Sequence, residues 1–361
     1  MKLIPLKDVK PNSYLGKTLY DSEGRVLLNC GAQLNKNIIQ KLIKYEIKSL
    51  YIIENSYNPE IKLIIKNELR DKCLNSLKNT FSGIHKNNIH TGENDSLNSI
   101  ILLAEELLDN ILSKDDMVYI LSDIKDKNPN IYDHSLNIAV ISLVVGIGLK
   151  LPKDDLLSLC IGALLHDIGK EFIDKNIIDK DGPLTSQEYE ILKEHCEKGY
   201  NYIKDIDIIP NDSKAIIHQH HERVDGTGYP RGLAENQINY LARIVSIADA
   251  YDALTSERNY MPSLSASDAL EYIMSNAGTL FDFEIVKFFS KVVVPFPNGT
   301  IVKLSTGDLG MVTETYRNFP LRPEVKIIKS SKSEREGTVI NLIDNLSIVI
   351  SETYKTIIII N

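Results

Sequence analysis

The sequence has only four cysteines among its 361 residues, and no two of them form a CxxC pair. This argues against a structural zinc site and against a disulfide framework. The sequence also lacks a long basic run, and its formal net charge is −8. General nucleic-acid binding is disfavoured, because it requires a basic patch that neutralises phosphates. Buried thiols in a reducing compartment are predicted at Cys30, Cys73, Cys160 and Cys196.

A long hydrophobic run is missing as well. The first ten residues, MKLIPLKDVK, have no apolar core of the kind that signal peptides carry. The longest nearly apolar stretch, residues 138–149, contains serine and glycine and is too short to span a bilayer. We therefore expect a cytoplasmic protein without a membrane span, in which this stretch forms a core helix.

The length predicts two or three domains. Residues 1–56 mix strand-like runs with one helix, which indicates a small α+β accessory domain. Residues 57–114 are predicted to be a helical linker with a polar loop at 82–96. From 115 to 290 the apolar spacing is almost wholly helical, whereas residues 291–361 alternate apolar runs with turns. The predicted fold is mainly α, with an all-helical catalytic domain and a small antiparallel β domain after it.

Histidine is concentrated in the helical segment, which holds six of the eight histidines. Imidazole and carboxylate groups suit first-row transition metals. The candidate ligands outnumber what one ion needs, so the sequence suggests two metal ions and hence hydrolysis of a phosphate ester. The candidates are His134, His166, Asp167, His195, His218, His220, His221 and Asp249.

The segment HDIGK, which begins at His166, is the centre of this pattern. The two carboxylate oxygens of Asp167 allow it to bridge two ions. Lys170 lies four residues after His166 on the same helical face, where it can meet a phosphate oxygen. His218 is interpreted as a surface or supporting residue, and Asp252 as a residue that orients a ligand.

The order of these motifs closely resembles the HD-GYP family, a branch of the HD hydrolase superfamily. The motifs are His134–Ser135, HDIGK, His195, His220–Glu222, Asp225–Pro230 and Ile247–Arg258. The resemblance covers roughly residues 115–290. It implies an all-helical metal-dependent cyclic di-GMP phosphodiesterase of bacterial second-messenger signalling.

The resemblance also implies which residues hold the two metals, with iron or manganese expected. His134, His166, Asp167 and Asp249 match the metal set of the superfamily. The ligands of a second metal are matched by His195, His220 and His221, with Asp167 as the bridge. Some members bind a third metal through a glutamate four residues before the first histidine, where this chain has Asn130, so two metals are predicted.

By the same resemblance, Lys170 and Arg258 would contact the substrate phosphates. Gly228, Tyr229 and Pro230 form the GYP element, a loop near the substrate that is also implicated in contacts with diguanylate cyclase domains. A homodimer is a further candidate assembly.

The expected reaction is in-line attack by a hydroxide that the two metals activate, with Asp167 and Lys170 as catalytic residues. Its product is linear pGpG, which the same site could cut again to GMP. Asp225 and Asp252 are the candidate acids for the leaving group, with water as the other option. Two alternatives stay open: a 3′,3′-cyclic GMP–AMP phosphodiesterase, and a catalytically silent scaffold that binds cyclic dinucleotides.

Overall fold

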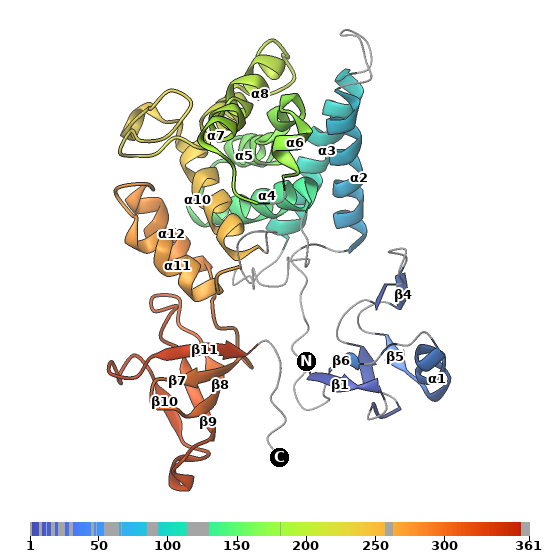
Figure 1. The fold of residues 1–361 in the computed structure, drawn as a ribbon, viewed down its shortest axis with the longest axis vertical. Coiled ribbons are helices and arrows are strands. Elements are labelled where there is room, and N and C mark those ends of the chain that lie inside the picture. Colours follow the sequence, from blue (N-terminus) through green and yellow to red (C-terminus); the bar gives the residue numbers. More distant parts are fainter. Residues whose placement is uncertain are drawn as a thin grey trace. The chain divides into compact units, whose positions relative to one another are not determined.

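The structure, a computed structural model, describes residues 67–84, 93–113, 130–180, 182–256 and 263–354, together with Ile65 and, with short gaps, residues 2–53. The chain divides into two compact units (Figure 1). One comprises residues 63–297 with 314–323, and the other comprises residues 1–62 with 298–313 and 324–361. The helical unit, the N-terminal segment and the C-terminal segment are described separately below.

The N-terminal segment forms the expected α+β structure. Its four-stranded sheet has the order β1-β6-β2-β5, and β3 pairs with β4. The elements are β1 (Lys2–Pro5), β2 (Ser13–Leu15), β3 (Leu19–Tyr20), β4 (Val26–Leu28), β5 (Gln33–Leu34), α1 (Lys36–Lys44) and β6 (Ser49–Ile53). Leu15, Leu34 and Leu50 are fully buried and supply a small core of its own.

The middle of the chain is helical, as the spacing of apolar residues predicts. The helices are α2 (Asn67–Gly83), α3 (Glu93–Leu112), α4 (Ile131–Gly148), α5 (Lys153–Leu165), η3 (Ile168–Phe172), α6 (Lys175–Ile178), α7 (Ser186–Lys193), α8 (His195–Ile203), α9 (Asn211–Gln219), η4 (Glu235–Gln237), α10 (Tyr240–Thr255), α11 (Ala266–Ser275) and α12 (Phe283–Val292).

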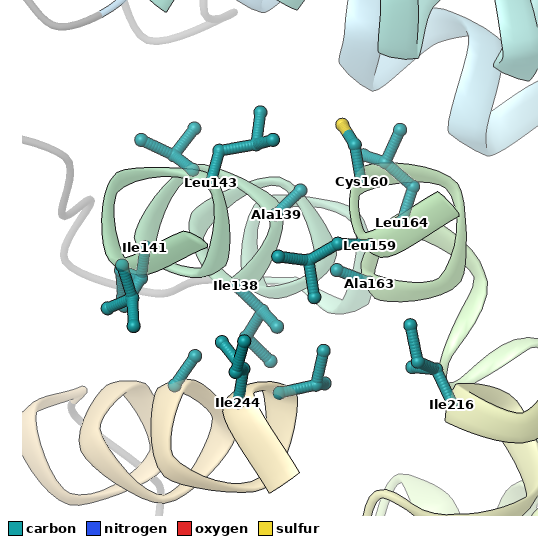
Figure 2. Close-up of a cluster of buried hydrophobic side chains, with 14 of the residues drawn as sticks. Ile138, Ala139, Ile141, Leu143, Leu159, Cys160, Ala163, Leu164, Ile216 and Ile244 are labelled. Carbon is teal, nitrogen blue, oxygen red and sulfur yellow. The ribbon is translucent and has the colours of Figure 1, made fainter. Parts of the chain in front are cut away.

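Helix α4 is the centre of the helical core. Among the described helices, it alone is long and apolar enough to cross a membrane, yet 72% of it is buried inside the unit, as in a core helix. It packs against α5 and α10, and α5 packs against α9. Figure 2 shows the side chains of α4 and α5 meeting Ile244 of α10 and Ile216 of α9. These helices position His134 in α4 and His166 and His220 at the ends of α5 and α9.

A glycine sets the spacing between α5 and α9. A Cβ atom at Gly162 would lie 2.5 Å from the Cδ1 atom of Ile216, so no larger residue fits without a shift. The close approach brings the C-terminal ends of both helices together. His166 caps α5 and His220 caps α9, and their ring centroids are 4.9 Å apart.

Helices α2 and α3 belong to the same compact unit as α4 and α5. Phe81 of α2 and Leu107 of α3 are fully buried in the core that α4 and α5 also line. Residues 57–114 are predicted from the sequence to be a helical linker, whereas α2 and α3 pack as part of the helical unit. An apolar stripe on each helix needs a covering partner, and the core of this unit provides it. Residues 85–92 of the expected polar loop lie outside the described residues.

The C-terminal segment forms the predicted antiparallel sheet. Its five strands have the order β10-β9-β8-β7-β11, so strands from both ends of the segment lie next to one another. They are β7 (Ile301–Leu304), β8 (Leu309–Glu314), β9 (Glu324–Lys329), β10 (Val339–Asn341) and β11 (Ile350–Tyr354), with a short helix, η5 (Ser333–Arg335), between β9 and β10. Val302 of β7, Val312 of β8 and Val325 of β9 are fully or almost fully buried.

Candidate metal centre

The candidate ligands lie at helix ends that the core packing brings together. His134 lies in the first turn of α4, and His195 is the first residue of α8. The cap of α4 is Asn130, whose side-chain oxygen accepts the amide hydrogens of Tyr132 and Asp133 at 2.9 and 3.0 Å. Asn130 therefore serves as the helix cap, and two metals rather than three remain a prediction.

The glycine of HDIGK positions η3 against α8. A Cβ atom at Gly169 would lie 1.9 Å from the carbonyl oxygen of His195 and 2.6 Å from the amide nitrogen of Gly199. Gly199 faces back, since its own Cβ would lie 3.1 Å from the amide nitrogen of Gly169. Only glycine permits this backbone contact. It brings His195 within reach of Asp167, which precedes η3.

The donors form two groups, each compact enough to hold one ion. The ligand atoms of His134, His166 and Asp167 all lie within 4.8 Å of one another. The second group meets the same limit and contains His195, Cys196, His220 and His221. From the sequence, Cys196 is predicted only to be a buried thiol, because cysteine spacing carries no signal when the other donors are histidines, two of which lie more than twenty residues away.

Asp167 presents one carboxylate oxygen to each group. Its Oδ2 atom is 3.2 Å from Nε2 of His166, and its Oδ1 atom is 3.4 Å from Nε2 of His195. Asp249 of α10 also reaches both sides, with Oδ1 3.2 Å from Nε2 of His134 and Oδ2 3.6 Å from Nδ1 of His221. The structure therefore brings together all seven predicted metal ligands.

Three of the histidines are held with Nε2 facing the centre. In each, Nδ1 bonds to the backbone carbonyl three residues earlier, at 2.8 Å for His166, 2.6 Å for His195 and 3.1 Å for His220. A carbonyl oxygen only accepts, so Nδ1 carries the hydrogen, and Nε2 is left free to bind a metal with its lone pair. Burial lowers the pKa of His195 to about 4 and that of His220 well below its usual value, so both rings are neutral at pH 7.

The arrangement suits metal ions, because several nitrogen and oxygen atoms that face the centre have lone pairs but no hydrogen to receive. Nε2 of His195 and Nε2 of His220 are 3.3 Å apart, and two bare lone pairs at that distance repel unless a cation satisfies both. Among the described residues, Nε2 of His166 and Oδ1 of Asp167 are buried without a hydrogen-bond partner. Such buried groups are costly unless they are paired or bind a metal.

The carboxylates in the centre are ionised. Burial alone would raise the pKa of Asp167, but the neighbouring His166 and Lys170 hold that pKa well below its usual range. Burial would likewise raise the pKa of Asp249, and the hydrogen bond from His134 and the nearby His221 overcome it. Metal ligation needs the deprotonated form of each group, so both are ready to bind.

Asp252 orients His134, in agreement with the sequence expectation. Its Oδ2 atom lies 2.7 Å from Nδ1 of His134, and Nδ2 of Asn137 donates to its Oδ1 atom at 3.2 Å. Burial would lower the pKa of His134, but hydrogen bonds to Asp249 and Asp252 raise it to about 9. Metal binding at Nε2 therefore releases a proton, while Asp252 keeps the ring in place.

Asp252→Asn is expected to lower metal affinity by about 10- to 100-fold while leaving the fold intact, as is usual when the partner of a ligating histidine is changed. Competition with a chelator would measure it. Asp154→Asn, at an exposed position in the first turn of α5, is the matched control. Equal affinity in the two variants would refute the orienting role.

The GYP loop folds back onto the histidine pair. A Cβ atom at Gly228 would lie 2.5 Å from Cα of Glu222, so this position also needs glycine. Glu222 is buried, and its carboxylate accepts the amide hydrogens of Arg231 at 2.8 Å and Leu233 at 3.0 Å. Sequence analysis gave Glu222 no role beyond its place in a motif, whereas it anchors the loop.

Tyr229 and Pro230 are joined by a cis peptide bond, and the ring of Tyr229 lies 4.7 Å from the ring of His221. Tyr229 therefore packs against the wall of the centre. His218 points elsewhere, since its Nε2 atom is 2.7 Å from Oε2 of Glu197. The predicted phosphate contact Arg258 lies outside the described residues.

Two segments match known domain families. Residues 120–285 match the HD domain family, and residues 301–358 match the KOW domain that is associated with HD domains. The first segment contains every donor of the two groups. The second match assigns the C-terminal sheet to a known domain family, whereas the sequence alone predicted only a small antiparallel β domain.

Curated relatives are similar over the same region. Cyclic di-GMP phosphodiesterase PA4108 of Pseudomonas aeruginosa is 33% identical, over 64% of this chain and 56% of that protein. The 3′3′-cGAMP-specific phosphodiesterase 3 of Vibrio cholerae is 33% identical, over 48% of this chain and 37% of that protein. The chain thus spans about half of the first relative's length and less of the second's.

A solved structure shares the fold. The HDG"Y"P protein Bd1817 of Bdellovibrio bacteriovorus superposes with a TM-score of 0.50 at 18% sequence identity. The superposition covers 80% of this chain and 97% of that one.

Proposed function

We propose that this chain, whose residues 120–285 match the HD domain family, is a metal-dependent phosphodiesterase of the HD-GYP type that hydrolyses cyclic di-GMP to pGpG, with GMP as the product of a second cut. The observation that carries the proposal is the placement of Asp167 between two groups of inward-facing donors, with one oxygen toward each. Two adjacent sites that share a carboxylate are suited to in-line displacement at phosphorus.

The proposed cofactors are two divalent ions, iron or manganese. One would be held by His134, His166, Asp167 and Asp249, and the other by Asp167, His195, His220 and His221. When bound, the ions would activate water near neutral pH and neutralise the charge of the phosphate. The chain's own part is to hold the donors rigidly at the helix ends, with the histidine tautomers already fixed.

Lys170 is the proposed phosphate contact. Its Nζ atom donates to Oδ2 of Asp167 at 2.6 Å, and a quarter of its side chain remains exposed. The ammonium group thus lies beside the bridging carboxylate and is accessible to a substrate. From there it would neutralise a non-bridging oxygen as negative charge develops.

Neither aspartate considered as the acid for the leaving group suits that role. Hydrogen bonds from Thr227 lower the pKa of Asp225, so it carries no proton at neutral pH. Asp252 is occupied with His134 and Asn137. We therefore propose that water protonates the departing ribose 3′ oxygen.

Lys170→Ala is expected to lower kcat by about 10²- to 10³-fold, the usual cost of removing one group that stabilises transition-state charge. The content of both metals should stay at the wild-type level, because Lys170 is not among the donors. Lys175→Ala, at an exposed position on α6, is the matched control. Loss of metal from the Lys170 variant would contradict the role.

The test of function is turnover by anaerobically purified protein supplied with Fe(II) or Mn(II), with cyclic di-GMP and 3′,3′-cyclic GMP–AMP assayed side by side. The His166→Ala, Asp167→Ala double variant is the control. Production of pGpG from cyclic di-GMP by the wild type alone supports the proposal. Faster cleavage of the mixed dinucleotide would assign the activity named for the Vibrio relative, and no product from metal-loaded protein would indicate a silent scaffold.

Three expectations from the sequence remain predictions. The GYP loop would dock a diguanylate cyclase domain, the chain would form a homodimer, and the protein would be cytoplasmic. The loop has exposed residues for such docking, including Arg223, Asp225 and Thr227, above its buried anchor Glu222.

A further inference from the structure

Cys196 lies inside the second histidine group rather than beside it. Its Sγ atom is 3.5 Å from Nε2 of His195 and within 4.8 Å of the ligand atoms of His220 and His221. The side chain is fully buried. Four donors, three nitrogens and one sulfur, therefore face one small volume.

Two of the separations have the values expected for donors that share one ion. Metal–nitrogen bonds of about 2.1 Å and metal–sulfur bonds of about 2.3 Å place two nitrogens about 3.4 Å apart, and a nitrogen and a sulfur about 3.6 Å apart. The corresponding distances here are 3.3 Å between Nε2 of His195 and Nε2 of His220, and 3.5 Å between Nε2 of His195 and Sγ of Cys196.

The other described cysteines provide a contrast within the same unit. Cys73 and Cys160 are equally buried, but both belong to the main hydrophobic core. Cys196 is absent from the described hydrophobic clusters and has imidazole rings as its neighbours. A thiol that served only to fill apolar space would be expected among aliphatic side chains, as the other two are.

We propose that Cys196 supplies a thiolate ligand to the ion held by His195, His220 and His221. The two positions of the centre then differ in chemistry. The position formed by His134, His166, Asp167 and Asp249 has nitrogen and oxygen donors, whereas the position at Cys196 adds a sulfur donor to three nitrogens and to Oδ1 of Asp167. A soft thiolate favours Zn(II) or Fe(II) over Mn(II), so the ion beside Cys196 is predicted to resist exchange by manganese. The inference rests on the proposed metal centre but not on the identity of the nucleotide.

The test uses full-length, metal-depleted protein loaded anaerobically with Co(II) and no substrate. A thiolate-to-cobalt charge-transfer band is expected in the near ultraviolet for the wild type and for Cys160→Ser, which is the matched control. Cys196→Ser and Cys196→Ala should lose the band completely. A band that persists in Cys196→Ser, or no band in wild-type protein with two cobalt ions bound, would overturn the assignment.

X-ray absorption of the zinc-loaded wild type provides a second readout that needs no variant. When both positions hold zinc, an average of about half a sulfur scatterer per zinc is expected at about 2.3 Å, and a shell of only nitrogen and oxygen would refute the proposal even if the serine variant fails to fold. Inactivity toward cyclic dinucleotides would reject the proposed function and leave this result standing. Failure of the wild type to bind either metal would reject both.

Discussion

Asp167→Asn should lose both metals and at least about a thousandfold in kcat. The amide has nearly the same size, but it removes the negative charge and replaces one oxygen with an NH2 group that cannot accept. Because one oxygen of Asp167 faces each histidine group, the substitution affects both positions at once. Metal ions contribute several kcal/mol of transition-state stabilisation, and each 1.36 kcal/mol is a factor of about ten in rate.

Elemental analysis of the purified variant, followed by turnover of cyclic di-GMP, would measure both effects. Asp179→Asn, at an exposed position after α6, makes the same chemical change away from the centre and should behave as wild type. If Asp167→Asn retained two ions and normal turnover, the bridging role would be wrong.

Gly169→Ala should damage the centre without touching any ligand. The new methyl group would lie 1.9 Å from the carbonyl oxygen of His195 and 2.6 Å from the amide nitrogen of Gly199, and backbone atoms cannot rotate away as side chains do. We expect η3 and α8 to separate, at a cost of about 1–3 kcal/mol in the free energy of unfolding. A shift of about 1 Å between His195 and Asp167 should also lower kcat about 100-fold.

Urea unfolding, metal content and turnover of the Gly169 variant would be compared with those of Gly83→Ala. A Cβ atom at Gly83 meets nothing within 4 Å, so that variant should match the wild type. Normal stability together with normal metal binding in Gly169→Ala would show that the two elements do not need this contact. Asp167→Asn tests the charge of the centre, and Gly169→Ala tests its geometry.

The chemistry of the centre could be predicted from the sequence alone. Imidazole and carboxylate groups define what a site can bind, and the number of candidate ligands around HDIGK predicted a metal site; two ions and a bridging aspartate remain predictions. The family resemblance, the helical domain and the C-terminal β sheet were likewise predicted and are present. Local signals explain this success, because ligand type, helical period and turn residues are each encoded within short stretches of chain.

Tertiary structure decided which groups meet. His166, His195 and Asp249 lie far apart in sequence and come together only because α5 and α10 pack against α4 while α8 packs against η3 and α9. The same packing brings Cys196 among histidines from another helix. Hydrophobic periodicity marks which face of a helix is buried but not which partner covers it. The packing of α2 and α3 and the place of Cys196 in the second donor group therefore depended on long-range contacts, while the sequence by itself determined which histidines and aspartates are candidate donors.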